Sequence, residues 1–150
     1  MPVETVSVDW VQDQEFLLKD HFGFPIVMTQ PMGVNGADLL PLSVIGCAAW
    51  DLAGILKKQR LQVTALNVIA ESEREEAPPW RFLKIHILYR VTGRKLKPES
   101  IRRGIELTED KYCSTLATLR KACEISSSFE ILEDPGEANL ETRSLREARI

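Results

Sequence analysis

Apolar and polar residues alternate most clearly at residues 80–92, WRFLKIHILYRVT. One face of this segment carries Leu83, Ile85, Ile87, Tyr89 and Val91, and the other carries Lys84, His86 and Arg90. This period of two predicts a half-buried antiparallel strand. Further strands are predicted at residues 3–10, 16–18, 24–28, 61–72 and 125–132. The first three form a predicted antiparallel meander, and 61–72 with 80–92 form a predicted hairpin around a charged, proline-bearing turn.

The apolar segment at residues 39–56, LLPLSVIGCAAWDLAGIL, predicts a long helix that ends near Gln59. Asp38 is placed to cap this helix. Pro41 falls in the first turn, where a missing amide hydrogen costs no hydrogen bond. Because the helix is apolar on nearly every side, it is predicted to lie at the centre of the domain or at a subunit interface.

The same segment is the one candidate for a membrane span in the sequence. Its length is at the short end of the roughly 17–25 residues that a span requires. Asp51 lies within it, and a buried aspartate would cost about 2.5–3.5 kcal/mol during insertion. The segment is therefore interpreted as a core helix, and no membrane association is expected.

Two shorter helices are predicted, one from Pro98 to about Lys111 and one from Cys113 to about Lys121. The resulting order is three strands, a helix, two strands, two helices and a last strand. Since strands and helices do not alternate, this order favours the α+β class over a doubly wound fold. We expect a single domain over residues 1–133, followed by a charged tail at residues 134–150.

Charge and cysteine content narrow the class of function. The net charge is −3 and the basic residues are not grouped, so a nucleic-acid-binding surface is not expected. The N-terminus carries Glu4 and Asp9 without a positively charged start, unlike a secretory signal. Three cysteines cannot all pair within one chain, so we expect reduced thiols in the cytoplasm.

Two of the cysteines are candidates for chemistry. Cys47 lies in the middle of the long helix among small residues, with Trp50 and Asp51 on the same helix face. Cys113 would gain thiolate character if it lay at a helix N-terminus. For both, the alternative is a buried thiol that only fills space, the role expected for Cys123.

Metal and cofactor sites are not expected. The sequence has no C-x-x-C motif, and His21 and His86 each stand alone in their segments. Gly33 and Gly36 precede the long helix but lack the full pattern of a phosphate-binding loop.

Two short motifs give the chain a family resemblance. Gly36-Ala37-Asp38-Leu39-Leu40 precedes Gly46-Cys47, and Tyr112-Cys113-Ser114 follows after 66 positions with a hairpin and a helix between. With this spacing and strand order, roughly residues 1–132 resemble the OsmC/Ohr family. Two segments look closest to the YhfA-like branch, whose function is less well defined: Gly46-Cys47-Ala48-Ala49-Trp50-Asp51 and Lys57-Lys58.

The resemblance implies an OsmC-like fold and an intertwined homodimer with sites at the subunit interface. It implies a thiol peroxidase of the peroxide stress response, an antioxidant oxidoreductase that reduces organic hydroperoxides. Cys47 would be the peroxidatic cysteine and Cys113 the resolving one, with Asp38, Trp50 and Asp51 in support. A dithiol reductant would restore the pair, and no cofactor is implied.

The sequence departs from the peroxidase pattern in its charged residues. The peroxidases of the family use an arginine from the N-terminal strands, but residues 1–59 contain none. Lys19 or Arg120 would have to replace it. Asp38 stands at the family's glutamate position, and Asp51 would raise the pKa of Cys47 unless it is paired. The alternative is therefore a non-peroxidase dimeric module that binds a small apolar or thiol-bearing ligand.

Overall fold

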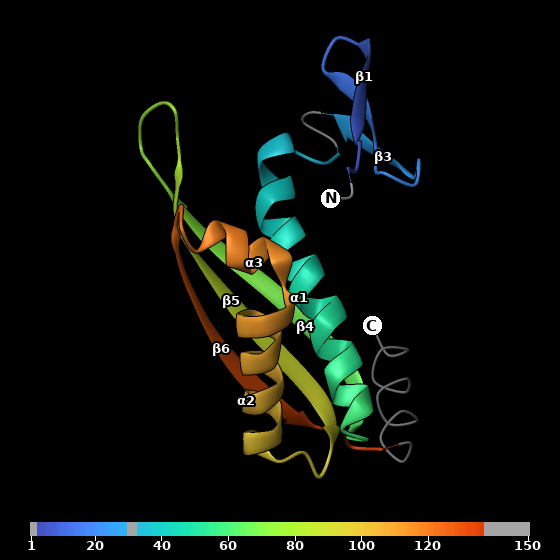
Figure 1. Cartoon of the computed structure of the whole chain (residues 1–150), viewed down its shortest axis with the longest axis vertical. Coiled ribbons are helices and arrows are strands. Elements are labelled where there is room, and N and C mark those ends of the chain that lie inside the picture. The colour runs from blue at the N-terminus through green and yellow to red at the C-terminus, as the bar shows by residue number, and fades with distance from the viewer. Residues whose placement is uncertain (1–2, 30–32, 137–150) are drawn as a thin grey trace, which may run out of the picture. The chain divides into compact units, whose positions relative to one another are not determined.

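The structure, a computed structural model, describes residues 3–29 and 33–136 (Figure 1). Within these residues the chain forms two compact units, which divide between Ser43 and Val44. Of the predicted charged tail, only its first three residues lie within the described part. The expectation of a single domain over residues 1–133 stays a prediction.

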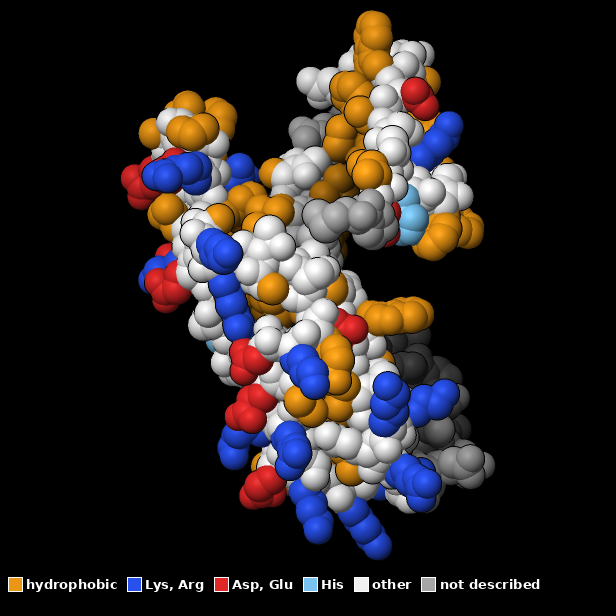
Figure 2. All heavy atoms as spheres, viewed as in Figure 1, with side chains coloured by type: hydrophobic (Ala, Val, Ile, Leu, Met, Phe, Trp, Pro, Cys, Tyr) orange, Lys and Arg blue, Asp and Glu red, His pale blue; other side chains and the backbone are white. Residues whose placement is uncertain are grey.

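The first unit is a small antiparallel sheet. It contains β1 (Ser7–Gln12), β2 (Glu15–Lys19) and β3 (Pro25–Thr29), in that spatial order. This arrangement confirms the predicted meander. All six residues of β1 are exposed, and β2 is half-buried along its length. Figure 2 shows apolar side chains gathered on the surface of this unit, with Trp10 70% exposed and Phe22 75% exposed.

The second unit is built on a three-stranded sheet in the order β4, β5, β6. β4 (Gln62–Arg74) and β5 (Phe82–Arg94) form the predicted antiparallel hairpin. β6 (Glu124–Glu133) runs parallel to β5, an orientation that the sequence did not indicate. A parallel pair needs a crossover connection, and helical segments supply it here.

The long helix α1 (Leu39–Lys58) confirms the prediction for residues 39–59. A short 3₁₀ helix, η1 (Gly36–Asp38), precedes it. The predicted capping role of Asp38 is wrong, because the Asn35 side chain accepts the hydrogen bond from the Ala37 amide at 3.0 Å. Asp38 itself is exposed.

The crossover consists of α2 (Pro98–Leu107), η2 (Thr108–Tyr112) and α3 (Ser114–Leu119). Pro98 opens α2 as predicted, but the regular helix ends at Leu107 instead of continuing to Lys111. The next turn widens to π geometry, and the Cys113 amide donates to the Thr108 carbonyl at 2.8 Å. Figure 1 shows α1, α2 and α3 on one face of the sheet formed by β4, β5 and β6.

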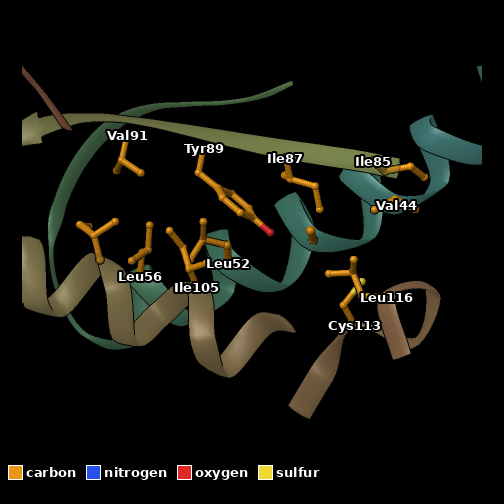
Figure 3. Close-up of a cluster of buried hydrophobic side chains, with 12 residues drawn as sticks. Val44, Leu52, Leu56, Ile85, Ile87, Tyr89, Val91, Ile105, Cys113 and Leu116 are labelled. Atoms are coloured by element: carbon orange, nitrogen blue, oxygen red, sulfur yellow. The ribbon is translucent and has the colours of Figure 1, made fainter. Parts of the chain in front are cut away.

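The core lies between β5 and the helices (Figure 3). From β5 come Ile85, Ile87, Tyr89 and Val91, and from α1 come Val44, Ala48, Leu52 and Leu56. The spacings of two and four residues are those that place side chains on one strand face and one helix face. Leu83 was predicted to share the buried face, but it is 43% exposed. It precedes Ile85, which is the first residue of β5 in the buried cluster.

Several residues on the outer face of α1 stay exposed among the described residues. Trp50 is 83% exposed, Leu42 is 48% exposed, and Gly46, Ala53 and Gly54 are also exposed. By length and composition alone, Gly36–Lys58 would suit a membrane span. Its buried residues nevertheless belong to the core of the second unit.

Candidate thiol site

Cys47 lies at the margin of the buried face of α1. Its neighbours Val44 and Ala48 are fully buried, whereas the Cys47 side chain is half-buried. Asp51 follows one helical turn later, and its Oδ2 lies 3.9 Å from the Cys47 sulfur. The helix therefore holds a thiol and a carboxylate next to each other, as the sequence predicts for positions i and i+4.

Cys113 lies at the junction of η2 and α3, and the backbone fixes it on both sides. Its amide donates to Thr108, and its carbonyl accepts from the Ala117 amide at 3.1 Å. The residue is only 2% exposed. Figure 3 shows it beside Leu116, at the end of the core that carries Val44 and Ile85.

The fold brings the two thiols together. The Cys47 sulfur, the Cys113 sulfur and an Asp51 carboxylate oxygen all lie within 4.8 Å of one another. Thr115 adds a hydroxyl 3.1 Å from the Cys113 sulfur. Cys123 lies outside this group and is also a free thiol. The pairing of Cys47 with Cys113 thus arises from tertiary structure, since 66 positions separate them.

The two thiols differ in their tendency to ionise. Burial raises the pKa of Cys47, but hydrogen bonds from Cys113 and Thr115 outweigh this effect and leave the pKa below its ordinary value. The charge of Asp51 opposes the lowering, as the sequence predicts, without reversing it. Burial and the hydrogen bond to Cys47 raise the pKa of Cys113. Cys47 is therefore the thiol that ionises first.

A polar cluster lies beyond Cys113 and was missed in the sequence. The buried Tyr89 hydroxyl donates to Glu109 at 3.1 Å, and Arg120 binds Glu109 at 3.1 Å and Asp110 at 2.9 Å. Burial and the charge of Glu109 raise the pKa of Tyr89 well above its usual range. In the sequence, Tyr89 looks like any other apolar residue of β5. Its hydrogen-bond acceptor, Glu109, becomes apparent only once η2 is known to lie opposite β5.

The cations considered as replacements for the missing N-terminal arginine have other partners. Arg120 is engaged by Glu109 and Asp110, and Lys19 lies 3.6 Å from Asp9 in the first unit. Hydrogen-bond donors, rather than either of these cations, are the groups that lower the pKa of Cys47.

A cleft of about 400 Å³ adjoins the thiol group through Asp51. Its walls come from α1 and from the crossover. They are formed by Trp50, Asp51, Gly54, Ile55, Lys58, Gln59, Leu107 and Tyr112. The cleft is thus mainly apolar, and it carries one carboxylate at the side that faces Cys47.

The fold and the site define a small α+β protein in which two reduced thiols converge. Residues 29–128 match the family model described as OsmC-like protein. The chain is also 34% identical over 128 residues to Protein YhfA of Escherichia coli strain K12, a match that covers 83% of this chain and 96% of YhfA. The chain therefore belongs to the OsmC-like protein family, which confirms the resemblance.

Solved structures confirm the fold. A hypothetical protein from Aquifex aeolicus is 28% identical, with a TM-score of 0.80 over 89% of this chain and 99% of that one. The organic hydroperoxide resistance protein OhrB of Bacillus subtilis is 14% identical, with a TM-score of 0.58 over 85% of this chain and 98% of OhrB. At this identity OhrB shares the fold alone.

Proposed function

We propose that this protein is a thiol-dependent peroxidase that reduces organic hydroperoxides through Cys47 and Cys113. The observation that carries the proposal is the approach of the two sulfurs to within 4.8 Å. The lowered pKa of Cys47 supports its role as the attacking thiol. Membership of the OsmC-like protein family supports the same reaction class.

In the proposed reaction, the Cys47 thiolate attacks the O–O bond of the hydroperoxide and takes one oxygen as a sulfenic acid. The other oxygen leaves with a proton as the alcohol. Cys113 then condenses with the sulfenic acid, which forms a disulfide and releases water. A dithiol reductant returns both thiols by exchange and becomes a disulfide itself. The raised pKa of Cys113 keeps this thiol protonated while Cys47 reacts.

We further propose that the protein acts in the cytoplasm as an intertwined homodimer with its sites at the subunit interface. The support is the apolar surface that is exposed among the described residues, on β1 and on the outer face of α1. Burial of such surface contributes about 25 cal/mol per Å². A second copy of the same chain could supply matching surfaces for both elements.

The cleft favours a second candidate, a non-peroxidase module that binds a small apolar or thiol-bearing ligand. Trp50, Ile55, Leu107 and Tyr112 give the cleft apolar walls, and its volume of about 400 Å³ suits a small molecule. This candidate needs no cation beside the thiols, in agreement with the engagement of Arg120 by acidic residues.

A coupled assay with cumene hydroperoxide and a dithiol reductant separates the two candidates. If the proposal holds, Cys47→Ser lowers turnover by at least about 10³-fold, as the loss of a covalent nucleophile does. Cys113→Ser permits a single oxidation but stops cycling, whereas the matched variant Cys123→Ser remains active. Undiminished turnover by Cys47→Ser would exclude the mechanism. Saturable binding of a hydrophobic probe after thiol blocking, weakened by Trp50→Ala, would favour the binding module.

A further inference from the structure

The grouping of Cys47, Asp51 and Cys113 has the composition of a metal site that the sequence did not predict. Two sulfurs and a carboxylate oxygen lie within 4.8 Å of one another among the described residues, and the Cys47 sulfur is 3.9 Å from Asp51 Oδ2. In a tetrahedral zinc site, with Zn–S of about 2.3 Å and Zn–O of about 2.0 Å, such atoms lie about 3.5–3.8 Å apart. Shifts of less than about 1 Å would therefore complete the geometry.

We propose that the reduced protein binds one thiophilic divalent cation of the Zn²⁺ type through Cys47, Cys113 and Asp51. Two sulfur ligands select such a cation over Mg²⁺ or Ca²⁺, which require oxygen ligands. Three protein ligands leave a fourth position for water or a small thiol, as in zinc sites that keep an open position. Cys47 and Asp51 are only half-buried, so the cation has a route to the site.

Binding releases the two thiol protons, and no electrons are transferred. The two thiolates balance the charge of the cation, and the Asp51 carboxylate brings the metal-bound site to a net charge of −1. Thr115 lies 3.1 Å from the Cys113 sulfur, where its hydroxyl can donate to a metal-bound thiolate. The backbone contacts that fix Cys113 between η2 and α3 hold this ligand in place before the cation arrives.

The site excludes the disulfide, because a bond between the two sulfurs removes both thiolate ligands. The cation would therefore hold Cys47 and Cys113 in the reduced form and make them unavailable to an oxidant. This inference rests on the thiol pair but not on the proposed peroxidase activity. A thiol pair that never turns over a hydroperoxide could still bind the metal.

Titration of the reduced, metal-free full-length chain with Co²⁺ tests the site directly. Thiolate-to-Co²⁺ charge-transfer absorption reports sulfur ligation, and displacement by Zn²⁺ in competition with a chromophoric chelator gives stoichiometry and affinity. We expect one cation per chain. Loss of groups that only support a ligand costs about 10–100-fold in affinity, so Cys47→Ser and Cys113→Ser should each cost at least about 100-fold. Asp51→Asn should cost about tenfold or more.

Cys123→Ser is the matched control, because it removes a thiol outside the group, and its affinity should equal that of the unaltered chain. Circular dichroism of each variant establishes that it is folded. Oxidation of both thiols by diamide, which takes up their two protons and two electrons, should abolish binding. Undiminished affinity in Cys47→Ser or Asp51→Asn, or binding that survives disulfide formation, would overturn the site. Failure of the hydroperoxide assay alone would overturn only the peroxidase.

Discussion

The two compact units place their apolar side chains in opposite ways. From Val44 onward, alternate residues of β5 and every fourth residue of α1 meet in a core that excludes solvent. Before Val44, none of the described residues is fully buried, and Trp10 of β1 is 70% exposed. Both units have strand-like patterns in sequence, but only one of them covers its apolar residues by itself.

A site with fixed geometry can form only where the residues around it are packed. The thiol group lies at the edge of a packed core, so its geometry is held by the same contacts that stabilise the second unit. The first unit offers apolar surface without a core, and this is the surface that the proposed dimer would cover.

The largest effect is expected inside the second unit. Leu52 is fully buried between α1 and the sheet, so Leu52→Ala should lower the free energy of unfolding by about 2–5 kcal/mol. Urea denaturation followed by circular dichroism measures the change. Leu132→Ala is the matched control, since this leucine of β6 is 47% exposed and its truncation should cost less. Equal costs at the two positions would contradict a core centred on α1 and β5.

The next effect concerns the first unit. If the exposed face of β1 is covered by a second copy, Trp10→Asp should remove an aromatic anchor and weaken the dimer by about 2 kcal/mol or more, close to 30-fold in Kd. Analytical ultracentrifugation over a concentration series measures this shift. Ser7→Asp adds the same charge to the same strand and should have little effect. A dimer that tolerates Trp10→Asp would show that β1 lies outside the interface.

A smaller effect is expected at the polar cluster beside Cys113. Glu109→Ala leaves the buried Tyr89 hydroxyl without its acceptor and should destabilise the second unit by about 1–3 kcal/mol. Tyr89→Phe removes the orphaned hydroxyl, so the double variant should recover part of the loss. A double-mutant cycle measures the coupling, expected at about 0.5 kcal/mol or more. Strict additivity would mean that the hydrogen bond contributes nothing to stability.

The smallest effect is a difference in pH dependence between the thiols. The folded chain lowers the pKa of Cys47 and raises that of Cys113, so alkylation by iodoacetamide should begin at lower pH for Cys47 than in the urea-unfolded chain. Cys113 should begin at higher pH than in the unfolded chain. Peptide mapping by mass spectrometry follows each site. Asp51→Asn removes a charge that raises the pKa of Cys47 and should move its midpoint further down; an upward shift would contradict this role.

Much of the fold could be predicted because the spacing of apolar residues indicates which positions are buried. The alternation at 80–92 located β5 and four of its buried residues, and turn residues located the meander. Periodicity does not report the partner or direction of a strand, so the parallel pairing of β6 with β5 was not foreseen. Helix patterns likewise gave no sign of the π turn at Thr108–Tyr112, which depends on local hydrogen bonds.

The two thiols of the candidate site were predicted from the sequence, but most of the residues around them were not. Cys47 and Cys113 were candidates from their local sequence and were paired through the family motifs, and Asp51 was found through helix spacing. The contact of Thr115 with Cys113 and that of Glu109 with Tyr89 depend on how the crossover returns to the sheet, which no local pattern encodes. Arg120 was considered as a cation for the thiols, but acidic residues of η2 bind it instead. Asp38 is exposed, and its predicted supporting role stays a prediction.

The distance along the chain between the two thiols has a further consequence. A covalent link between residues 47 and 113 would join α1 to the crossover across more than a third of the sequence. Cross-linking a span of this length removes conformational entropy from the unfolded chain that corresponds to about 4 kcal/mol in the chain-entropy treatment. Oxidation would thus raise the melting temperature of the protein, and reduction would lower it again in each redox cycle.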